Sequence, residues 1–215
     1  MANTRERILI SAQALAQVRG YNGFSYADIS AELAITKPSI HHHFASKAEL
    51  AVALVAQYRK RFELARRPWE DPSLSPREQL TGYAGLYAEV FSDGGRMCLC
   101  GVFAADAASL PEPARAATAA FFLDQQRWVT DAFRAAGLAT DRAGRAASAY
   151  LAALEGALLL ARVVRASRAP AAAAPPDARP TQPSAATVVA DSAAGLASAT
   201  SGVSDIAATL LDALL

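Results

Sequence analysis

The chain has 215 residues, of which 53% are hydrophobic and 19% charged, so it is long enough to bury a sizeable core in one or two domains. Its formal net charge of +1 is lower than a protein that coats DNA without sequence preference would be expected to carry. The two cysteines do not require a disulfide framework.

The charges are divided unevenly along the chain. Residues 1–67 hold ten Lys/Arg and five Asp/Glu, whereas residues 68–215 hold eleven and fifteen. A basic first part on an acidic remainder is typical of a protein whose first domain meets a polyanion, although ordinary scatter of surface charge produces the same split in some proteins.

The sequence shows neither a secretory signal nor a membrane-spanning stretch. Arg5, Glu6 and Arg7 interrupt the start of the chain, where a secretory signal needs an apolar run. The longest apolar stretch, residues 149–162, contains Glu155 and is shorter than the roughly 20 residues that span a bilayer. We therefore expect a cytoplasmic protein with no membrane partner.

The first predicted helix covers residues 3–19, where apolar residues recur at helical spacing before Gly20. A second begins after Ser25, which forms a capping box with Asp28. The turn that follows contains Ala34, and an alanine there predicts a turn without positive φ.

A very short helix is predicted after Thr36, its cap, with Pro38 in the first turn. Ile40 and Phe44, four residues apart, anchor it from one side. A helix of about two turns is not stable alone, so its purpose is to present its other side. That outward side carries Lys37, Pro38, Ser39, His41 and His42.

Ser46 and Glu49 form a third capping box, which opens a helix from Lys47 to about Leu64. Prolines between residues 68 and 76 then mark a linker. A helix, a three-residue turn and a short second helix with small and basic side chains is the geometry that enters a DNA major groove. We divide the chain into a helix-turn-helix DNA-binding domain (1–47), a connecting helix (48–67) and a helical regulatory domain (68–215).

The first 50 residues carry a set of short motifs: TRERIL at 4–9, Gly20-Tyr21, Ile29, Lys37-Pro38-Ser39, His42-His43-Phe44 and Ser46-Lys47. With these motifs they resemble the DNA-binding domain of the TetR/AcrR transcriptional regulators. The resemblance is dense over about a quarter of the chain, and beyond it only the helical layout and length are similar. The family usually has glycine where this chain has Ala34, and tyrosine where it has His41.

The resemblance implies which residues meet DNA. It assigns base edges to Lys37, Pro38, Ser39 and His42, next to the cap Thr36, and phosphates to Tyr26, His41, His43 and Lys47. A lysine can donate to guanine, and a proline offers an apolar edge to a thymine methyl.

The three consecutive histidines do not form a metal site, because helix neighbours project about 100° apart and cannot converge on one ion. We predict no metal and no cofactor. A histidine that touches phosphate binds better when charged, so DNA binding should strengthen as the pH falls from about 8 to 6.

The rest of the chain reads as helices throughout, which predicts an all-α protein. Four body helices are predicted. The first starts at Ser75 or Pro76 and ends before Gly94. The others run from Arg96 to about Leu110, from Pro111 to Gly137, and from Arg142 to about Val164. Residues 166–203 break the pattern with prolines, alanines and serines and predict a flexible insertion. A last helix follows over Ser204–Leu215.

The resembled family forms a dimer through its last two helices. This implies a homodimer interface made by Arg142–Val164 and Ser204–Leu215, in a C-terminal domain that combines ligand binding and dimerisation. It also implies a palindromic double-stranded DNA operator and release by a small-molecule inducer, that is, a dimeric repressor.

A ligand pocket is predicted among the body helices, although an aromatic stripe at helical spacing is more often core. Its expected lining is Tyr83, Tyr87, Phe103, Phe121, Trp128 and Phe133. Cys98 and Cys100, two apart on a helix, favour at least one buried thiol. The alternative is a sensor of electrophiles, in which Arg96 and a helix N-terminus lower a thiol pKa.

Two other classes are weighed against a sequence-specific regulator. An architectural DNA protein would bind with steep salt dependence and no sequence preference. A cysteine-dependent enzyme needs a base beside the thiol, and all three histidines lie in the first domain. We predict that the protein is not an enzyme.

Overall fold

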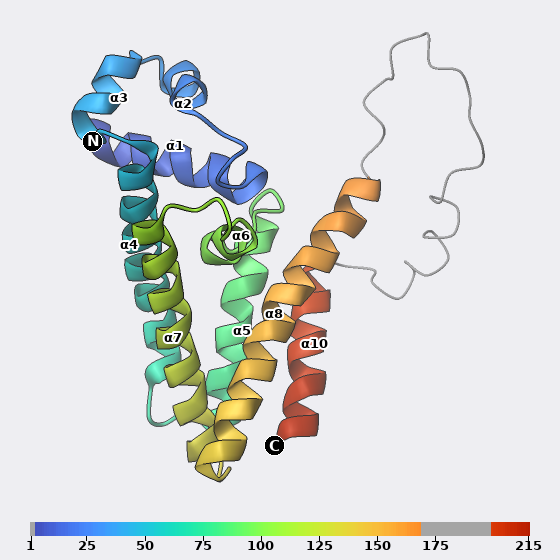
Figure 1. The fold of residues 1–215 in the computed structure, drawn as a ribbon. Helices are drawn as coiled ribbons and strands as arrows, with labels where there is room; N and C mark the ends of the chain where they lie inside the picture. The colour runs from blue at the N-terminus through green and yellow to red at the C-terminus, as the bar shows by residue number, and fades with distance from the viewer. Residues whose placement is uncertain (1–2, 169–198) are drawn as a thin grey trace.

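The computed structural model describes residues 3–168 and 199–215, and all secondary structure in these ranges is helical (Figure 1). This confirms the all-α prediction. The first domain is built from α1 (Thr4–Arg19), α2 (Tyr26–Leu33) and α3 (Lys37–His43). The long helix α4 (Lys47–Arg66) leaves this domain and continues along the body.

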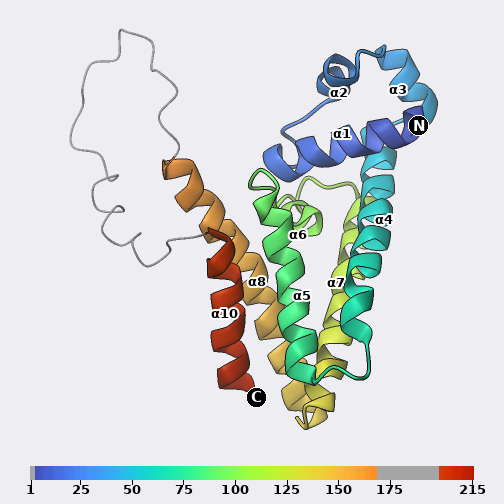
Figure 2. The same cartoon turned by 180° about the vertical axis from the view of Figure 1, so that it is seen from behind.

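The body consists of long helices that run side by side, with one short helix next to the first domain (Figures 1 and 2). A 3-10 turn, η1 (Arg67–Glu70), leads from α4 into α5 (Pro76–Ser92). The short α6 (Leu99–Ala105) lies under α1. The remaining body helices are α7 (Glu112–Ala135), α8 (Thr140–Arg168) and α10 (Ala199–Leu214).

Packing in the body follows the apolar faces of these helices. The chain-terminal helix α10 packs on α5 and α8, and α7 packs on α4 and α8. On α10 the buried residues are Val203, Ala207 and Leu211, spaced four apart, so one stripe faces the body.

The helix starts that have a side-chain cap at Ser25, Thr36 and Ser75 were predicted well, because caps are local. Ser25 and Asp28 form the expected capping box, Thr36 accepts a hydrogen bond from the Ser39 N–H, and Ser75 forms a box with Glu78. The capping box predicted for Ser46 and Glu49 is only half formed. Ser46 accepts from the Glu49 N–H, but the Glu49 carboxylate accepts from the N–H of Ala45 instead of Ser46.

Several boundaries of the body helices were wrong. The helix predicted over 96–110 covers only Leu99–Ala105, because Cys98 has an extended conformation (φ −52°, ψ 125°) and Asp106 ends the helical turn. The helix predicted over 142–164 runs from Thr140 to Arg168. Helix also covers 166–168 and 199–203 at the edges of the predicted insertion, and its remaining part, 169–198, lies outside the described residues.

The full length of α8 changes one sequence argument. Residues 140–167 are long and apolar enough to cross a membrane by length and composition alone, which the stretch 149–162 was not. The helix packs against α5, α7 and α10, and this packing buries part of its apolar surface.

Ala34 has a left-handed conformation (φ 53°, ψ 42°) at the end of α2, so the prediction of a turn without positive φ was wrong. Its N–H caps the helix by donating to the Ser30 carbonyl. The left-handed geometry is required to reverse the chain toward α3, and an L-residue with a Cβ adopts it at a cost of roughly 1 kcal/mol.

Replacement of Ala34 by glycine is therefore expected to raise the free energy of unfolding by about 0.5–1 kcal/mol. Chemical denaturation of the purified variant measures this change. The matched control is Ala31→Gly, at an exposed position inside α2, which should lower stability by about 1 kcal/mol. Equal destabilisation by both substitutions would contradict the strain at Ala34.

Candidate functional site

The helix α3 is held from behind by two completely buried side chains. Ile40 has no exposed surface and Phe44, the residue after the helix, is 1% exposed. Lys37, Pro38 and His41 are exposed on the other side, together with His42. The apolar spacing thus fixes which side of α3 packs on the domain and leaves the predicted DNA-binding residues accessible.

A surface pocket of about 390 Å³ lies where α2, α3 and the start of α4 meet. It brings together four of the residues predicted to contact DNA: Tyr26, Lys37, His41 and Lys47. The Tyr26 and His41 rings meet edge to face with centroids 4.7 Å apart. His42 and His43 pair with each other at 5.3 Å and do not line this pocket.

Two of the predicted phosphate contacts also have internal partners. The Lys47 ammonium donates to the Phe24 carbonyl and lies 4.6 Å and 4.4 Å from the centroids of the Tyr21 and Phe24 rings. Burial lowers the Lys47 pKa. The Tyr26 hydroxyl donates to the Phe44 carbonyl at 2.9 Å, and burial raises its pKa to about 12. Both side chains therefore help to hold α2, α3 and α4 together.

The first domain is hydrogen-bonded to the segment around α6. The buried Gln17 amide donates to the Met97 carbonyl at 2.7 Å, before α6 begins. The Tyr21 N–H donates to the Asp106 carboxylate at 2.7 Å, where α6 ends. Gly20 adopts φ +80° there, and a Cβ on it would lie 2.8 Å from the Asp106 carboxylate oxygen. A displacement of α6 would therefore pull on α1.

The aromatic residues predicted to line a ligand pocket do not form one group. Tyr83, Tyr87 and Phe121 gather around Phe62, with centroid distances of 5.4–5.8 Å, and Trp128 stacks on Tyr83 at 5.1 Å. In contrast, Phe103 packs on Tyr21 of the first domain, and Phe133 packs on Tyr150. All six except Trp128 are buried, so in this structure they form core.

The environment of the two cysteines differs from the expectation of a reactive thiol. Cys98 and Cys100 are both buried, and burial raises both thiol pKa values, with the Glu155 carboxylate adding to the effect. Arg96 pairs with Asp93 at 2.6 Å. The favoured expectation of at least one buried thiol is therefore confirmed, and the alternative, in which Arg96 and a helix N-terminus lower a thiol pKa, is wrong.

Glu155 on α8 is a buried ionisable residue that was not predicted from the sequence to have a role. Its Oε1 atom is enclosed and has no hydrogen-bond partner among the described residues, and its other oxygen occupies the space beside Gly101 that a Cβ would need. Burial raises the Glu155 pKa to about 7, and the nearby Cys98 thiol partly opposes this rise. The sequence feature that could have indicated a buried carboxyl here is the position of Glu155 as a single acidic residue inside the apolar stretch 149–162.

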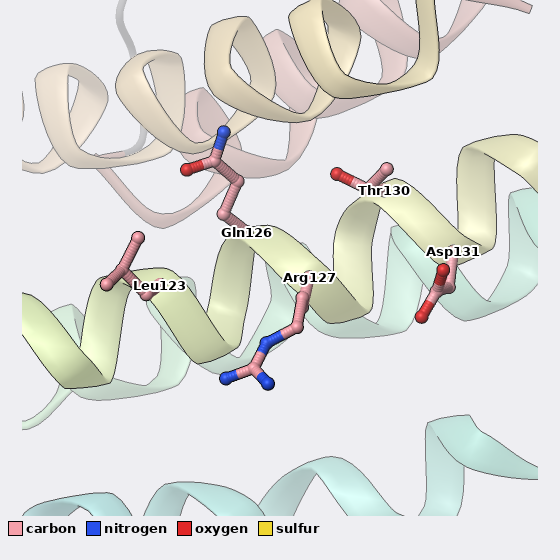
Figure 3. A pocket seen from close by; sticks show the side chains of 5 residues that line it. All are labelled: Leu123, Gln126, Arg127, Thr130 and Asp131. Carbon is pink, nitrogen blue, oxygen red and sulfur yellow. The ribbon is translucent and has the colours of Figure 1, made fainter. Parts of the chain in front are cut away.

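Another pocket, of about 420 Å³, lies on the outer face of α7 (Figure 3). All five lining residues come from this one helix, and their side chains spread along its surface instead of converging. The lining consists of Leu123, Gln126, Arg127, Thr130 and Asp131. This open groove does not coincide with the predicted ligand pocket.

Comparison with known proteins places this arrangement in a family. The sequence model described as "Bacterial regulatory proteins, tetR family" matches residues 8–54. The one described as "Transcriptional regulator LmrA/YxaF-like, C-terminal domain" matches residues 76–174. A TetR transcriptional regulator from Legionella pneumophila is 33% identical, with a TM-score of 0.74, over 76% of this chain and 89% of its own. The chain belongs to the TetR family.

Two further relatives agree with this assignment. A TetR-family regulator from Agrobacterium tumefaciens is 35% identical with a TM-score of 0.69, over 74% of this chain and 86% of its own. An uncharacterized HTH-type transcriptional regulator of Lactococcus lactis subsp. lactis is 28% identical over 77% of this chain and 86% of its own. Membership of the TetR family explains why α1 to α3 form a helix-turn-helix, and it makes the protein a transcriptional regulator.

Proposed function

We propose that this TetR-family regulator is a homodimeric repressor that binds a palindromic operator and leaves it when a small-molecule inducer binds the body. The observation that carries the proposal is the exposed side of α3, held outward by buried Ile40 and Phe44. A side chain on a helix fixed in this way can reach base edges in the major groove. The proposed contacts are Thr36, Lys37, Pro38, Ser39 and His42 for bases, and Tyr26, His41, His43 and Lys47 for phosphates.

The exposed apolar surface of α8 supports the homodimer. Leu159, Leu160 and Val163 are 53%, 63% and 69% exposed, close together near the C-terminal end of the helix. Large apolar side chains gathered at one place on a surface favour burial against another protein. We propose that the dimer interface is formed by residues 142–164 and 204–215, within the regulatory domain 68–215. We also propose that the protein acts in the cytoplasm.

Selection of bound fragments from genomic DNA at moderate salt tests the proposed function. A dimer with two equivalent α3 helices should recover a palindrome with half-sites about one DNA turn apart. Recovery of random fragments with steep salt dependence would instead support an architectural DNA-binding protein.

The histidines of α3 give a pH-dependent prediction. Affinity for the selected operator should rise several-fold as the pH falls from about 8 to 6, because a charged imidazole attracts phosphate. Electrophoretic mobility shifts at both pH values measure the change. A variant with His41→Tyr and His43→Gln should lose this dependence, and an unchanged rise in the variant would assign it to other groups.

A further inference from the structure

The end of the body farthest from α3 holds an arginine shared between two partners. Arg66, the last residue of α4, donates from Nη1 to the Gln125 side-chain oxygen at 3.1 Å and from Nε to the Glu70 carboxylate at 2.8 Å. Its side chain is only 14% exposed, and its guanidinium lies 5.3 Å from the centroid of the Trp128 ring. A cation is thus fixed in a largely buried position beside an aromatic ring.

The side chain of Gln125 lies beside this arginine in the core of the body. The residue is completely buried, and its amide oxygen accepts from Arg66 and from the Tyr83 hydroxyl at 3.4 Å. Its Nε2 atom has no partner among the described residues. A buried donor without an acceptor costs roughly 1–3 kcal/mol, so an acceptor supplied from outside the chain would lower the free energy of this site.

A pocket opens beside Arg66, although neither Arg66 nor Gln125 lines it while Glu70 is in place. It has a volume of about 280 Å³, and its lining includes Glu70 and Trp128, which both contact Arg66. The Trp128 ring stacks on Tyr83 at an angle of 21°, so the pocket has a rigid aromatic wall. Asp131 on the pocket rim is paired with Arg134 at 3.6 Å.

We propose that this place is a binding subsite for aromatic carboxylates. The ligand carboxylate takes the position of the Glu70 carboxylate on Arg66 and accepts from the Gln125 amide, while its ring lies against Trp128. A carboxylate suits these donors because its two oxygens can accept from a guanidinium and an amide at once. Glu70 then serves as the internal substitute for the ligand and must be displaced.

This subsite rests on the proposed function, because it names the chemical class of the inducer. Its position connects it to the DNA-binding residues through one element, since α4 begins at Lys47 beside α3 and ends at Arg66. A ligand that moves the end of α4 changes the position of its start and therefore the spacing of two α3 helices in a dimer.

The test measures binding of β-naphthoate and of its uncharged isostere β-naphthamide to the full-length protein by isothermal titration calorimetry without DNA. We expect β-naphthoate to bind at least about tenfold more tightly, because only the acid forms the charge-assisted pair with Arg66. The Arg66→Met variant should bind both compounds equally. Equal affinity in the wild-type protein, or no binding of β-naphthoate, would overturn the proposal.

A second variant, in which the affinity for β-naphthoate should increase, tests the proposal even if Arg66→Met does not fold. Glu70→Gln removes the competing carboxylate and should strengthen β-naphthoate binding several-fold while leaving β-naphthamide unchanged. Glu63→Gln is the matched control, since Glu63 pairs with Arg59 on the same helix at the same i,i+4 spacing. No gain in Glu70→Gln, or an equal gain in both variants, contradicts the subsite.

The outcome is independent of the test for operator binding. Selection of a palindrome together with absent β-naphthoate binding would leave the regulator intact and remove this ligand class. Charge-dependent β-naphthoate binding without any selected DNA would retain the subsite and remove the proposed function.

Discussion

Replacement of Glu155 by glutamine is expected to stabilise the protein by about 3 kcal/mol at pH 8 but by only about 1 kcal/mol at pH 5. Burial of the carboxyl raises its pKa from the ordinary value of 4.5 to about 7. Below the lower value both the folded and the unfolded chain hold the proton, so Glu155 costs nothing. Between the two values the unfolded chain releases the proton while the folded chain keeps it, so stability falls as the pH rises and reaches its full loss once the folded carboxyl also ionises.

Urea denaturation at pH 5 and pH 8 measures both free energies of unfolding. The glutamine keeps the shape of the side chain and has no proton to lose, so its advantage should grow with pH across this window. Glu89→Gln, at an exposed position on α5, is the control and should leave the pH profile of the wild-type protein unchanged. A constant difference between wild type and Glu155→Gln would show that the carboxyl does not titrate in this range.

Lys37→Ala is expected to weaken operator binding by about tenfold to hundredfold per protomer, without a change in the free energy of unfolding. Lys37 is exposed at the first turn of α3, so its removal leaves the packing of the helix intact. Fluorescence anisotropy with the selected operator measures the loss. If Lys37 contacts a base, its loss should relax the sequence preference at one position of each half-site.

The control for this experiment is Lys60→Ala, which removes an exposed lysine of α4. It should change operator affinity by less than about twofold, because this part of α4 lies several turns beyond Lys47. If Lys37→Ala weakens binding to all sequences equally and reduces the salt dependence, Lys37 contacts phosphate instead of a base.

The helix-turn-helix was predictable because its signals are local. Caps such as Ser25, Thr36 and Ser75 act within one helical turn, and the pair Ile40 and Phe44 defines the buried side of α3 without reference to the rest of the chain. Ala34 was mispredicted because its backbone geometry is imposed by the direction in which α3 must leave α2. Glycine is the usual residue for that geometry, and because position 34 is an alanine, the sequence did not indicate it.

The body was less predictable, since its important contacts join residues far apart in the sequence. Tyr83 and Trp128 were expected in one pocket, and they do stack, but Phe103 packs on the first domain and Phe133 on Tyr150. Periodicity shows that such residues face inward and cannot show which neighbour each one meets. The cysteines show the same limit, because their raised pKa values come from burial beside Glu155 on another helix.

The sequence by itself determined the order of the helices, the family to which the first 50 residues are similar and the face that α3 presents, because each depends on residues within a few turns of one another. Only the tertiary structure decided that Gln125 and Glu155 hold polar atoms without a partner within residues 3–168 and 199–215, and that the Arg66 guanidinium lies against the Trp128 ring. Solvation and pairing of a side chain depend on every element packed around it, and this information exists only once the helices are assembled.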